Sequence, residues 1–373
     1  MHRYRYLAAT IALVGLVSLR GIWGSPTAWS AGTRDIGEER TDLPIVAIWA
    51  QPSNDSLFSF KPDCGGGDCD LVQASYVNWL ASAGIRSLPI GYDASPEEIK
   101  PIMDGANGLL FPGGLPTLTD GVRWALEYAL DLNVVDGDFF PVWGTCLGWE
   151  WMAEVYAGDY PVVTDDFDAE NLTQSLGLLP HAAESRILSG FSAEILHKMT
   201  TEPLATNAHH KGVAPDDLVK SGLDDMFRVV AINTDRGGIK EYVSIVEAFD
   251  YPMYGLQWHP EKSQFDWGLN PDGTPYHVIN HTKDAVEVSQ EMVKFFASEV
   301  RRNGHSFSPI SEWENKMLHT MPVTPTGPRF GQIYFFPAID GAAGGMASDM
   351  RPSIEVVESV PNELEPPLLS RPQ

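Results

Sequence analysis

A cysteine between two glycines is the residue of this sequence whose surroundings most favour chemistry. Cys146 stands in a Gly-x-Cys-x-Gly motif, after the apolar run 139–143 and before the helically spaced run 147–156. Strand, sharp turn and helix in this order form a nucleophile elbow, with cysteine where many hydrolases carry serine. Glycine tolerates the backbone angles of a tight turn, and a helix start favours the thiolate. The alternative is a buried structural cysteine, a common fate for this residue type, but the flanking glycines favour a reactive nucleophile.

A second motif, His259-Pro260-Glu261, offers a base and a carboxylate directly after the apolar run 253–258. In an extended chain residues i and i+2 point to the same side, and the proline keeps His259 extended. We therefore expect Glu261 to hold the imidazole of His259 in one tautomer, as the acid of a catalytic triad does. A histidine and a glutamate at a strand end can equally be surface residues, so this motif alone does not establish function.

Acyl transfer to a cysteine also needs hydrogen-bond donors for the developing oxyanion. Pro112-Gly113-Gly114 ends another short apolar run, 108–111, and its glycines would let the main chain approach a substrate. We expect the oxyanion hole to consist of the backbone N–H of Leu147 and one N–H of the glycine pair, assigned to Gly114.

The elements around these motifs alternate between strands and helices. Strand-like apolar runs occupy 43–50, 85–90, 108–111 and the residues before Cys146. Helical patterns occupy 71–83, 95–103 (opened by a Ser95/Glu98 capping box) and about 120–132. This alternation predicts an α/β fold with a mostly parallel central sheet and helices on both faces. Active sites of such sheets lie at the carboxyl ends of strands, where the three motifs fall.

The second half of the chain predicts extra strands and a terminal helix. Strand-like runs lie at 227–233, 242–249 and 253–258, a helix at 192–199 and a longer one at 284–300. Residues 332–336 could dock on the domain, which we place at 43–340. Residues 341–373 are dominated by glycine, proline and acidic residues and predict a disordered tail.

Composition and targeting signals restrict the partners and the compartment. The chain has 373 residues, 43% of them hydrophobic, and a formal net charge of −25, which argues against binding to nucleic acid or anionic membranes. A basic start and the apolar stretch 7–19 predict a signal peptide over residues 1–25, with an uncleaved membrane anchor as the competing interpretation. We expect a protein of the secretory pathway, either secreted or delivered to a lysosome or vacuole, without membrane contact after cleavage.

The three cysteines and three glycosylation sequons fit that route. An odd number of cysteines in an oxidising compartment leaves one thiol free, and Cys64 and Cys69 bracket a short glycine-rich loop that a disulfide could close. Cys146 is then the free one. The sequon asparagines, candidates for N-glycosylation, are Asn54, Asn171 and Asn280.

No metal site and no cofactor is predicted. The adjacent side chains of His209 and His210 diverge, and Cys64 and Cys69 lack a second pair of ligands. The glycine-rich loop is not a phosphate loop, because no lysine and Ser/Thr follow it.

Together these motifs resemble a known family. The Pro-Gly-Gly turn, the Gly-x-Cys-x-Gly elbow and Gln257-Trp258-His259-Pro260-Glu261 resemble the landmarks of the flavodoxin-like class I glutamine amidotransferase fold. The segments that are similar to gamma-glutamyl hydrolases within it are 74–77, 83–84, 141–148, 233–235 and 259–262. The similarity spans about residues 43–340.

The resemblance implies a role for each site residue. Cys146 would be the nucleophile, His259 the general base and acid, and Glu261 the residue that orients it. A further histidine of the family's site maps onto His209 or His210, and the sequence does not choose between them.

The activity implied is hydrolysis of γ-glutamyl bonds in folyl and antifolate poly-γ-glutamates, with no cofactor. The polyanionic tail would need cations, and Lys211 and Lys262 stand beside the motifs, although solvated lysines are the alternative. Other candidates are a glutaminase subunit, a hydrolase of another γ-glutamyl peptide, and a catalytically silent relative. No synthetase domain follows from the sequence pattern, which argues against the glutaminase subunit. The intact Cys146, His259 and Glu261 argue against the catalytically silent relative. The sequence leaves open endo or exo cleavage and the formation of a homodimer.

Overall fold

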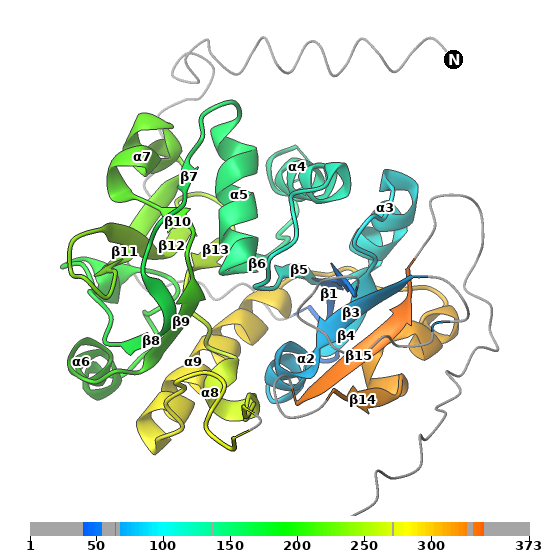
Figure 1. The fold of residues 1–373 in the computed structure, drawn as a ribbon. Coiled ribbons are helices and arrows are strands. Elements are labelled where there is room, and N and C mark those ends of the chain that lie inside the picture. The colour runs from blue at the N-terminus through cyan, green and yellow to red at the C-terminus, as the bar shows by residue number, and fades with distance from the viewer. Residues whose placement is uncertain are drawn as a thin grey trace, which may run out of the picture. The chain divides into compact units, whose positions relative to one another are not determined.

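A seven-stranded sheet forms the centre of the fold (Figure 1). The computed structural model describes residues 40–53, 64, 68–135, 137–270, 272–326 and 331–338. The strand order is β11-β12-β13-β6-β5-β1-β4. The parallel strands are β1 (Ile45–Trp49), β4 (Arg86–Ile90), β5 (Gly108–Phe111), β6 (Val142–Thr145) and β13 (Met253–Leu256). The antiparallel additions are β11 (Phe227–Thr234) and β12 (Glu241–Ala248). The predicted fold class is confirmed.

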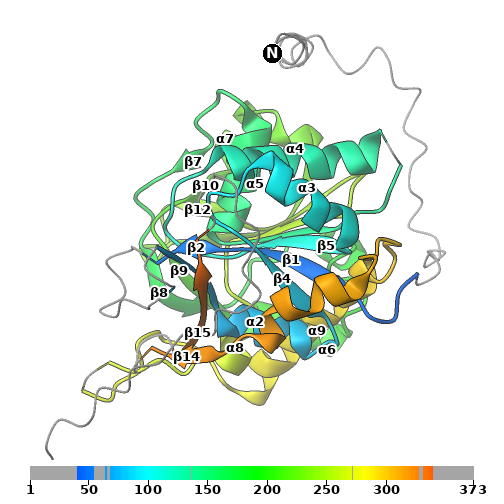
Figure 2. The ribbon, with the colours of Figure 1, turned by 90° about the vertical axis from the view of Figure 1, so that its right-hand side faces the viewer.

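Helices cover both faces of this sheet (Figure 2). One face carries α2 (Ala74–Ala81), α6 (Ala193–Thr201), α8 (Lys262–Phe265) and α9 (Lys283–Val300). The other carries α3 (Pro96–Gly105), α4 (Asp120–Val134), α5 (Leu147–Ala157) and α7 (Pro215–Lys220). Strand β1 shows why the sheet needs both layers: Val46 and Ile48 pack on the first face, and Ala47 and Trp49 on the second. Such strands have no polar face, which is why they appear as continuous apolar runs.

The helix expected over 71–83 is wrong at its start, where the structure has a strand. Residues Cys69–Gln73 form β3, and α2 begins only at Ala74. Leu71 pairs with Gln51 of β2 (Gln51–Pro52) on one side and with Phe335 of β15 (Gln332–Pro337) on the other. These pairs lie far apart in sequence, so tertiary pairing overrides the local helical pattern here. The docking strand expected over 332–336 is thus β15, and β14 (Val323–Pro325) completes the sheet β14-β15-β3-β2.

Two small antiparallel pairs lie beside the main sheet. Strand β8 (Ala169–Gln174) pairs with β9 (Ala205–His209), and β7 (Val163–Thr164) pairs with β10 (Gly212–Val213). Short 3-10 helices occupy Ala182–Glu184, Leu223–Asp225, Ile310–Glu312, Glu314–Lys316 and Leu318–Thr320. His209 is the last residue of β9, which carries it toward the sheet's catalytic edge: the N–H of His259 donates to the carbonyl of Thr206 (2.9 Å).

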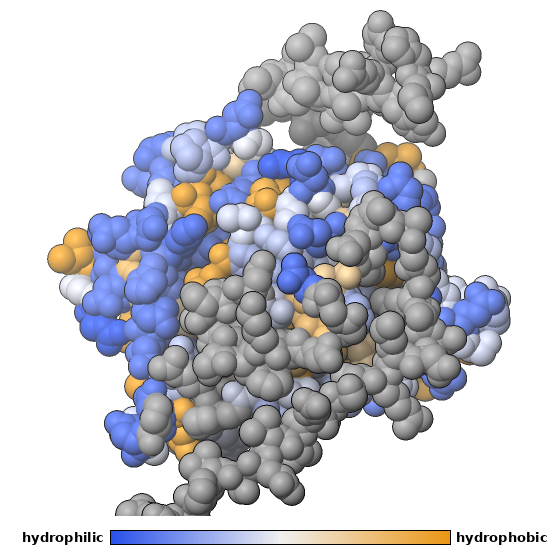
Figure 3. Space-filling view, turned by 45° about the vertical axis from the view of Figure 1, so that its right-hand side comes forward, coloured by the Kyte–Doolittle hydropathy of each residue, from blue (hydrophilic) through white to orange (hydrophobic). Residues whose placement is uncertain are grey.

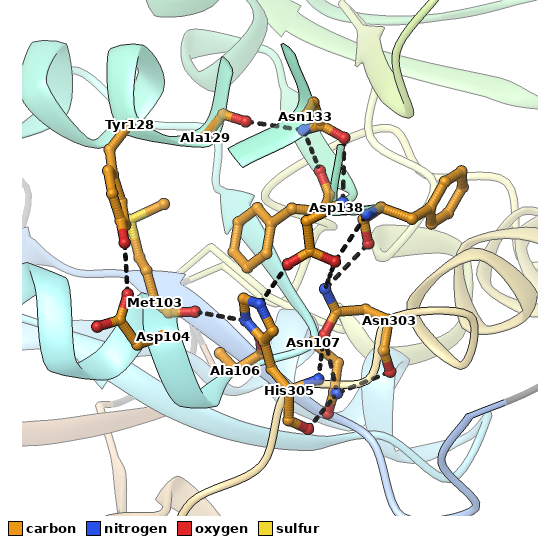
Figure 4. Close-up of polar contacts among 12 residues, drawn as sticks. Met103, Asp104, Ala106, Asn107, Tyr128, Ala129, Asn133, Asp138, Asn303 and His305 are labelled. Atoms are coloured by element: carbon orange, nitrogen blue, oxygen red, sulfur yellow. Dashed lines mark hydrogen bonds and ion pairs between the residues drawn. The ribbon is translucent and has the colours of Figure 1, made fainter. Parts of the chain in front are cut away.

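A polar network secures the opposite, amino-terminal edge of the sheet (Figure 4). Asn107 accepts from the N–H of Ile45 (2.9 Å) and donates to the carbonyl of His305 (2.9 Å). Asn303 donates to the carbonyl of Phe139 (3.0 Å), and the His305 ring pairs with the Asp138 carboxylate. The segments that lead into β1, β5 and β6 are therefore tied together, which leaves the other edge for the catalytic motifs.

The described surface is mainly hydrophilic, with apolar side chains in small groups on the face shown in Figure 3. None of the described helices is long and apolar enough to span a membrane. The segments predicted as a signal peptide (1–25) and a disordered tail (341–373), together with Asn54, lie outside the described residues.

Candidate active site

Cys146 forms the elbow between β6 and α5, in a conformation rare for a non-glycine residue, φ 52° and ψ −109°. Such backbone strain costs on the order of 1–3 kcal/mol and tends to occur at functional sites. Its N–H donates to the carbonyl of Leu256 in β13 (2.6 Å), and its carbonyl accepts from the N–H of Glu150 (3.0 Å). The neighbouring strand and the helix thus hold the thiol at the carboxyl edge of the sheet.

The flanking glycines serve close packing and not unusual backbone angles, which corrects the expectation above. Neither Gly144 nor Gly148 has a positive φ. A Cβ on Gly148 would lie 2.2 Å from the carbonyl oxygen of Phe111, and one on Gly144 would lie 2.7 Å from the carbonyl carbon of Gly148. The missing side chain of Gly148 lets the start of α5 pack against β5, and that of Gly144 lets β6 pack against α5.

The Cys146 thiol is buried, and its environment opposes ionisation. Its Sγ lies 3.9 Å from the carbonyl oxygen of Ala208 and 3.8 Å from Nε2 of Gln257. Burial, followed by the charge of Glu150, raises the pKa of Cys146 well above its usual range, against a smaller opposing effect of the Leu147 N–H. The thiolate that the helix start was expected to favour is therefore disfavoured by the surroundings of Cys146. The proton has to leave when the sulfur attacks.

His259 is the candidate acceptor of that proton. Its Nδ1 lies 2.8 Å from Oε1 of Glu261, and both side chains are buried. Among the described residues its Nε2 has no hydrogen-bond partner. The two residues face each other through a turn and not through an extended strand, since Glu261 is helical (φ −68°) and precedes α8. With Glu261 at Nδ1, Nε2 is the nitrogen left to exchange protons.

Gly113 lies between the thiol and the imidazole. A Cβ on Gly113 would lie 2.5 Å from Cε1 of His259 and 3.2 Å from Cβ of Cys146. The β5 turn therefore needs glycine at this position so that both groups can flank the same point in space.

We expect Gly113→Ala to lower kcat by about 10²-fold, because displacing a reacting group by about 1 Å costs that much. The matched control is Gly190→Ala, where a Cβ would meet nothing within 4 Å. Steady-state kinetics and thermal denaturation of both variants check this. Equal kcat values for the two variants would show that His259 does not need the space at Gly113.

Tyr76 is a site residue that the sequence motifs did not identify. Its buried hydroxyl accepts from the Gly113 N–H (2.8 Å) and lies 3.4 Å from Nδ1 of His259. Because the N–H of Gly113 is occupied, Gly114 is the better placed of the two glycines to donate to an oxyanion. Gln51 donates to the carbonyl of Gly113 and fixes the same turn from β2. Tyr76 had no sequence signal beyond its place in a family-like segment.

Glu150 and Gln257 were missed as well. Glu150 lies four residues after Cys146, on the same side of α5, and accepts from Nε2 of Gln257 (2.9 Å). Burial raises the pKa of Glu150 to about 7. The i+4 spacing from the nucleophile could have marked Glu150, whereas only the sheet brings Gln257 to it.

Glu150 should give the protein's stability a pH dependence. As pH rises from 4.5 to about 7, the unfolded chain loses this proton while the folded chain keeps it, so stability falls over that range and is then level. Glu150→Gln cannot ionise, and its side-chain carbonyl still accepts from Gln257. Between pH 4.5 and about 7, the free energy of unfolding of the wild type should fall by on the order of 3 kcal/mol more than that of the variant. Denaturant unfolding across this pH range tests it, and parallel curves would contradict it.

Of the two adjacent histidines, His209 is buried and His210 is exposed. Its Nδ1 lies 2.7 Å from the carbonyl oxygen of Lys211, and its buried Nε2 has no partner within the described part of the chain. Burial lowers the pKa of His209 to about 3, so the ring is neutral. His210 is exposed and lies 3.8 Å from a carboxylate oxygen of Glu170.

The two candidate lysines also differ. Lys262 is buried, and its ammonium lies 2.8 Å from Oδ2 of Asp266, so its charge is already paired. Lys211, two residues after His209, is exposed.

The cysteine pair and the described sequons have defined contacts. Cys64 and Cys69 form a disulfide, and Cys146 is the free cysteine of the described residues. Asn171 accepts from the N–H of Val278 (2.5 Å), which leaves its amide nitrogen for a glycan. The amide nitrogen of Asn280 donates to the carbonyl of Pro203 (2.8 Å), a contact that a glycan would disturb.

Comparison with known proteins gives concordant matches. The family model "Glutamine amidotransferase class-I" matches residues 68–271. Gamma-glutamyl hydrolase B of Dictyostelium discoideum is 36% identical over 79% of this chain and 83% of its own. Gamma-glutamyl hydrolase of Homo sapiens is 34% identical over 71% and 82%. A solved glutamine amidotransferase from Methylobacillus flagellatus covers 71% of this chain and 97% of its own, with 15% identity and a TM-score of 0.41.

Proposed function

Because the chain belongs to the gamma-glutamyl hydrolase family, with the class I glutamine amidotransferase fold, we propose that it hydrolyses folyl poly-γ-glutamates through a thioester on Cys146. The observation that supports the mechanism is the oriented imidazole of His259: Glu261 lies at Nδ1, Nε2 has no hydrogen-bond partner among the described residues, and Cε1 lies beside Gly113, which Cβ of Cys146 also approaches. A thiol on a strained elbow and a fixed base at the same strand edge are the components of nucleophilic acyl transfer.

In the first half of the reaction Sγ of Cys146 attacks the γ-carbonyl carbon and its proton passes to Nε2 of His259. Glu261 stabilises the resulting imidazolium through Nδ1. The tetrahedral oxyanion accepts hydrogen bonds from the N–H groups of Leu147 and Gly114. Nε2 then protonates the leaving amine, the C–N bond breaks, and a γ-glutamyl thioester remains.

In the second half a water molecule attacks the thioester, with His259 now taking the proton from water. Collapse of the second tetrahedral species expels the Cys146 sulfur, which regains its proton from His259. The products are the folyl part, whose shortened tail now ends in a γ-carboxylic acid, and the glutamate or oligoglutamate that left as the amine in the first half. His209 is neutral, and its Nε2, unpaired among the described residues, supplies a further hydrogen bond in this site; exposed Lys211 offers a cation to the tail.

We place this activity in the domain 43–340 of a protein of the secretory pathway. The Cys64–Cys69 disulfide supports that route, because disulfides persist in oxidising compartments.

Mass spectrometry of the products of pteroyl-tri-γ-glutamate, beside its α-linked isomer and free glutamine, tests the proposal. We expect cleavage of the γ-linked substrate only. Release of ammonia from glutamine without cleavage of the γ-linked tail would overturn the proposal in favour of a glutaminase.

A further inference from the structure

A pocket of about 200 Å³ is lined by α2, the segment after α8 and β15. Its walls combine two aromatic side chains with amides and one carboxylate. The residues that matter here are Gln73, Asn78, Phe265, Asp266, Trp267 and Gln332. Drug-sized ligands generally occupy roughly 300 Å³ or more, so this pocket is sized for one fused ring system. Ring faces and amide donors and acceptors together suit a planar heterocycle.

Trp267 is exposed but rigidly held. Its side chain is 65% exposed, yet the indole Nε1 donates to the carbonyl of Gln264 (3.3 Å). One indole face stacks on the His281 ring at 3.7 Å and 8°, and Nδ1 of that ring lies 2.9 Å from the carbonyl oxygen of Ser263. An aromatic ring that is already fixed loses little entropy when another ring stacks on it. The indole is therefore preorganised at the rim of the pocket.

Two walls of this pocket continue directly into the catalytic machinery. Asp266 lines the pocket and binds the Lys262 ammonium, and Lys262 follows Glu261 in sequence. On the other wall Ser75 lines the pocket, and the next residue, Tyr76, accepts the N–H of Gly113. The pocket therefore borders α2 and the segment around α8, the two elements that also carry Tyr76 and the residue after Glu261.

We propose that this pocket, with Trp267 at its rim, binds the fused heterocyclic ring of the substrate's head group. The inference rests on the proposed function, since a folyl substrate carries such a ring on the acyl side of its γ-linked tail. The ring stacks on Trp267 and Phe265, and its polar edge meets the amides of Gln73, Asn78 and Gln332. Asp266 is not a ligand, because its oxygens are engaged by Lys262 and by the Gly268 N–H.

The test compares two substrates that differ only in this ring, pteroyl-tri-γ-glutamate and p-aminobenzoyl-tri-γ-glutamate. In Trp267→Ala we expect the KM for the pteroyl substrate to rise roughly tenfold, because the ring loses one stacking partner. A tenfold change corresponds to about 1.4 kcal/mol of binding free energy. The KM for the p-aminobenzoyl substrate should stay within about twofold, and Trp267→Phe should recover most of the loss. Phe249→Ala is the matched control, since Phe249 is also an exposed aromatic but follows β12 at the opposite edge of the sheet.

The outcomes separate the two claims. An equal rise in KM for both substrates, or no rise for either, would overturn the heterocycle site while the hydrolase remains. If wild-type protein cleaves neither substrate, the proposed function itself fails. Calorimetric binding of pteroic acid to Cys146→Ala protein gives a second readout: binding that the added Trp267→Ala change does not weaken would also overturn the site.

Discussion

Cys146→Ala is expected to lose essentially all hydrolytic activity while it remains folded. Alanine removes the attacking sulfur but keeps a Cβ at the strained position, so the Leu256 and Glu150 main-chain hydrogen bonds that hold the elbow stay in place. Removing the nucleophile of an acyl-transfer site lowers kcat by a factor on the order of 10⁴ or more. Turnover of the γ-linked substrate by mass spectrometry, with circular dichroism as the folding control, measures this.

Cys146→Ser is the companion variant, because a hydroxyl has nearly the same shape. Its pKa lies far above that of a thiol, and this buried site already disfavours an anion, so serine should also be nearly inactive. Activity of Cys146→Ala near that of the wild type would mean that another group attacks the substrate, and such activity of Cys146→Ser would mean that the site does not need a thiol.

Glu261→Gln should produce the second largest loss, about 10³- to 10⁴-fold in kcat with a small change in KM. The glutamine amide can turn its NH₂ group toward Nδ1 of His259, which moves the ring proton to Nε2. In that tautomer Nε2 cannot accept the thiol proton. The corresponding change of a triad acid in other hydrolases costs about 10⁴. Steady-state kinetics that separate kcat from KM check this prediction.

Glu299→Gln is the matched control for that change. Glu299 is also buried and bonded, to Tyr254 and Arg302, but on α9 away from the thiol. We expect this variant to lose stability and to keep its kcat. A comparable fall in kcat for both variants would assign the effect of Glu261 to general destabilisation.

The sequence predicted the elements whose determinants are local. The buried parallel strands form continuous apolar runs, and the capping box of Ser95 and Glu98 opens α3 as expected. Cys146, His259 and Glu261 can be predicted from the sequence for the same reason, because each of their motifs directly follows an apolar run.

What the sequence could not give depends on contacts between distant segments. β3 was mistaken for helix because its partners, Gln51 and Phe335, lie 20 and more than 260 positions away from Leu71. The raised pKa of Cys146 depends on how completely the fold buries it. The pairing of Lys262 with Asp266, a residue outside the motifs, likewise depends on the fold around α8.

The most direct test of the central claim is to trap the acyl-enzyme. Wild-type protein mixed with pteroyl-tri-γ-glutamate is quenched in acid within the first turnover, digested and analysed by mass spectrometry. The account predicts a pteroyl-γ-glutamyl adduct on the peptide that contains Cys146, labile to hydroxylamine as a thioester is, and absent from Cys146→Ala. An adduct on another residue, or turnover by Cys146→Ala at the wild-type rate, would contradict it.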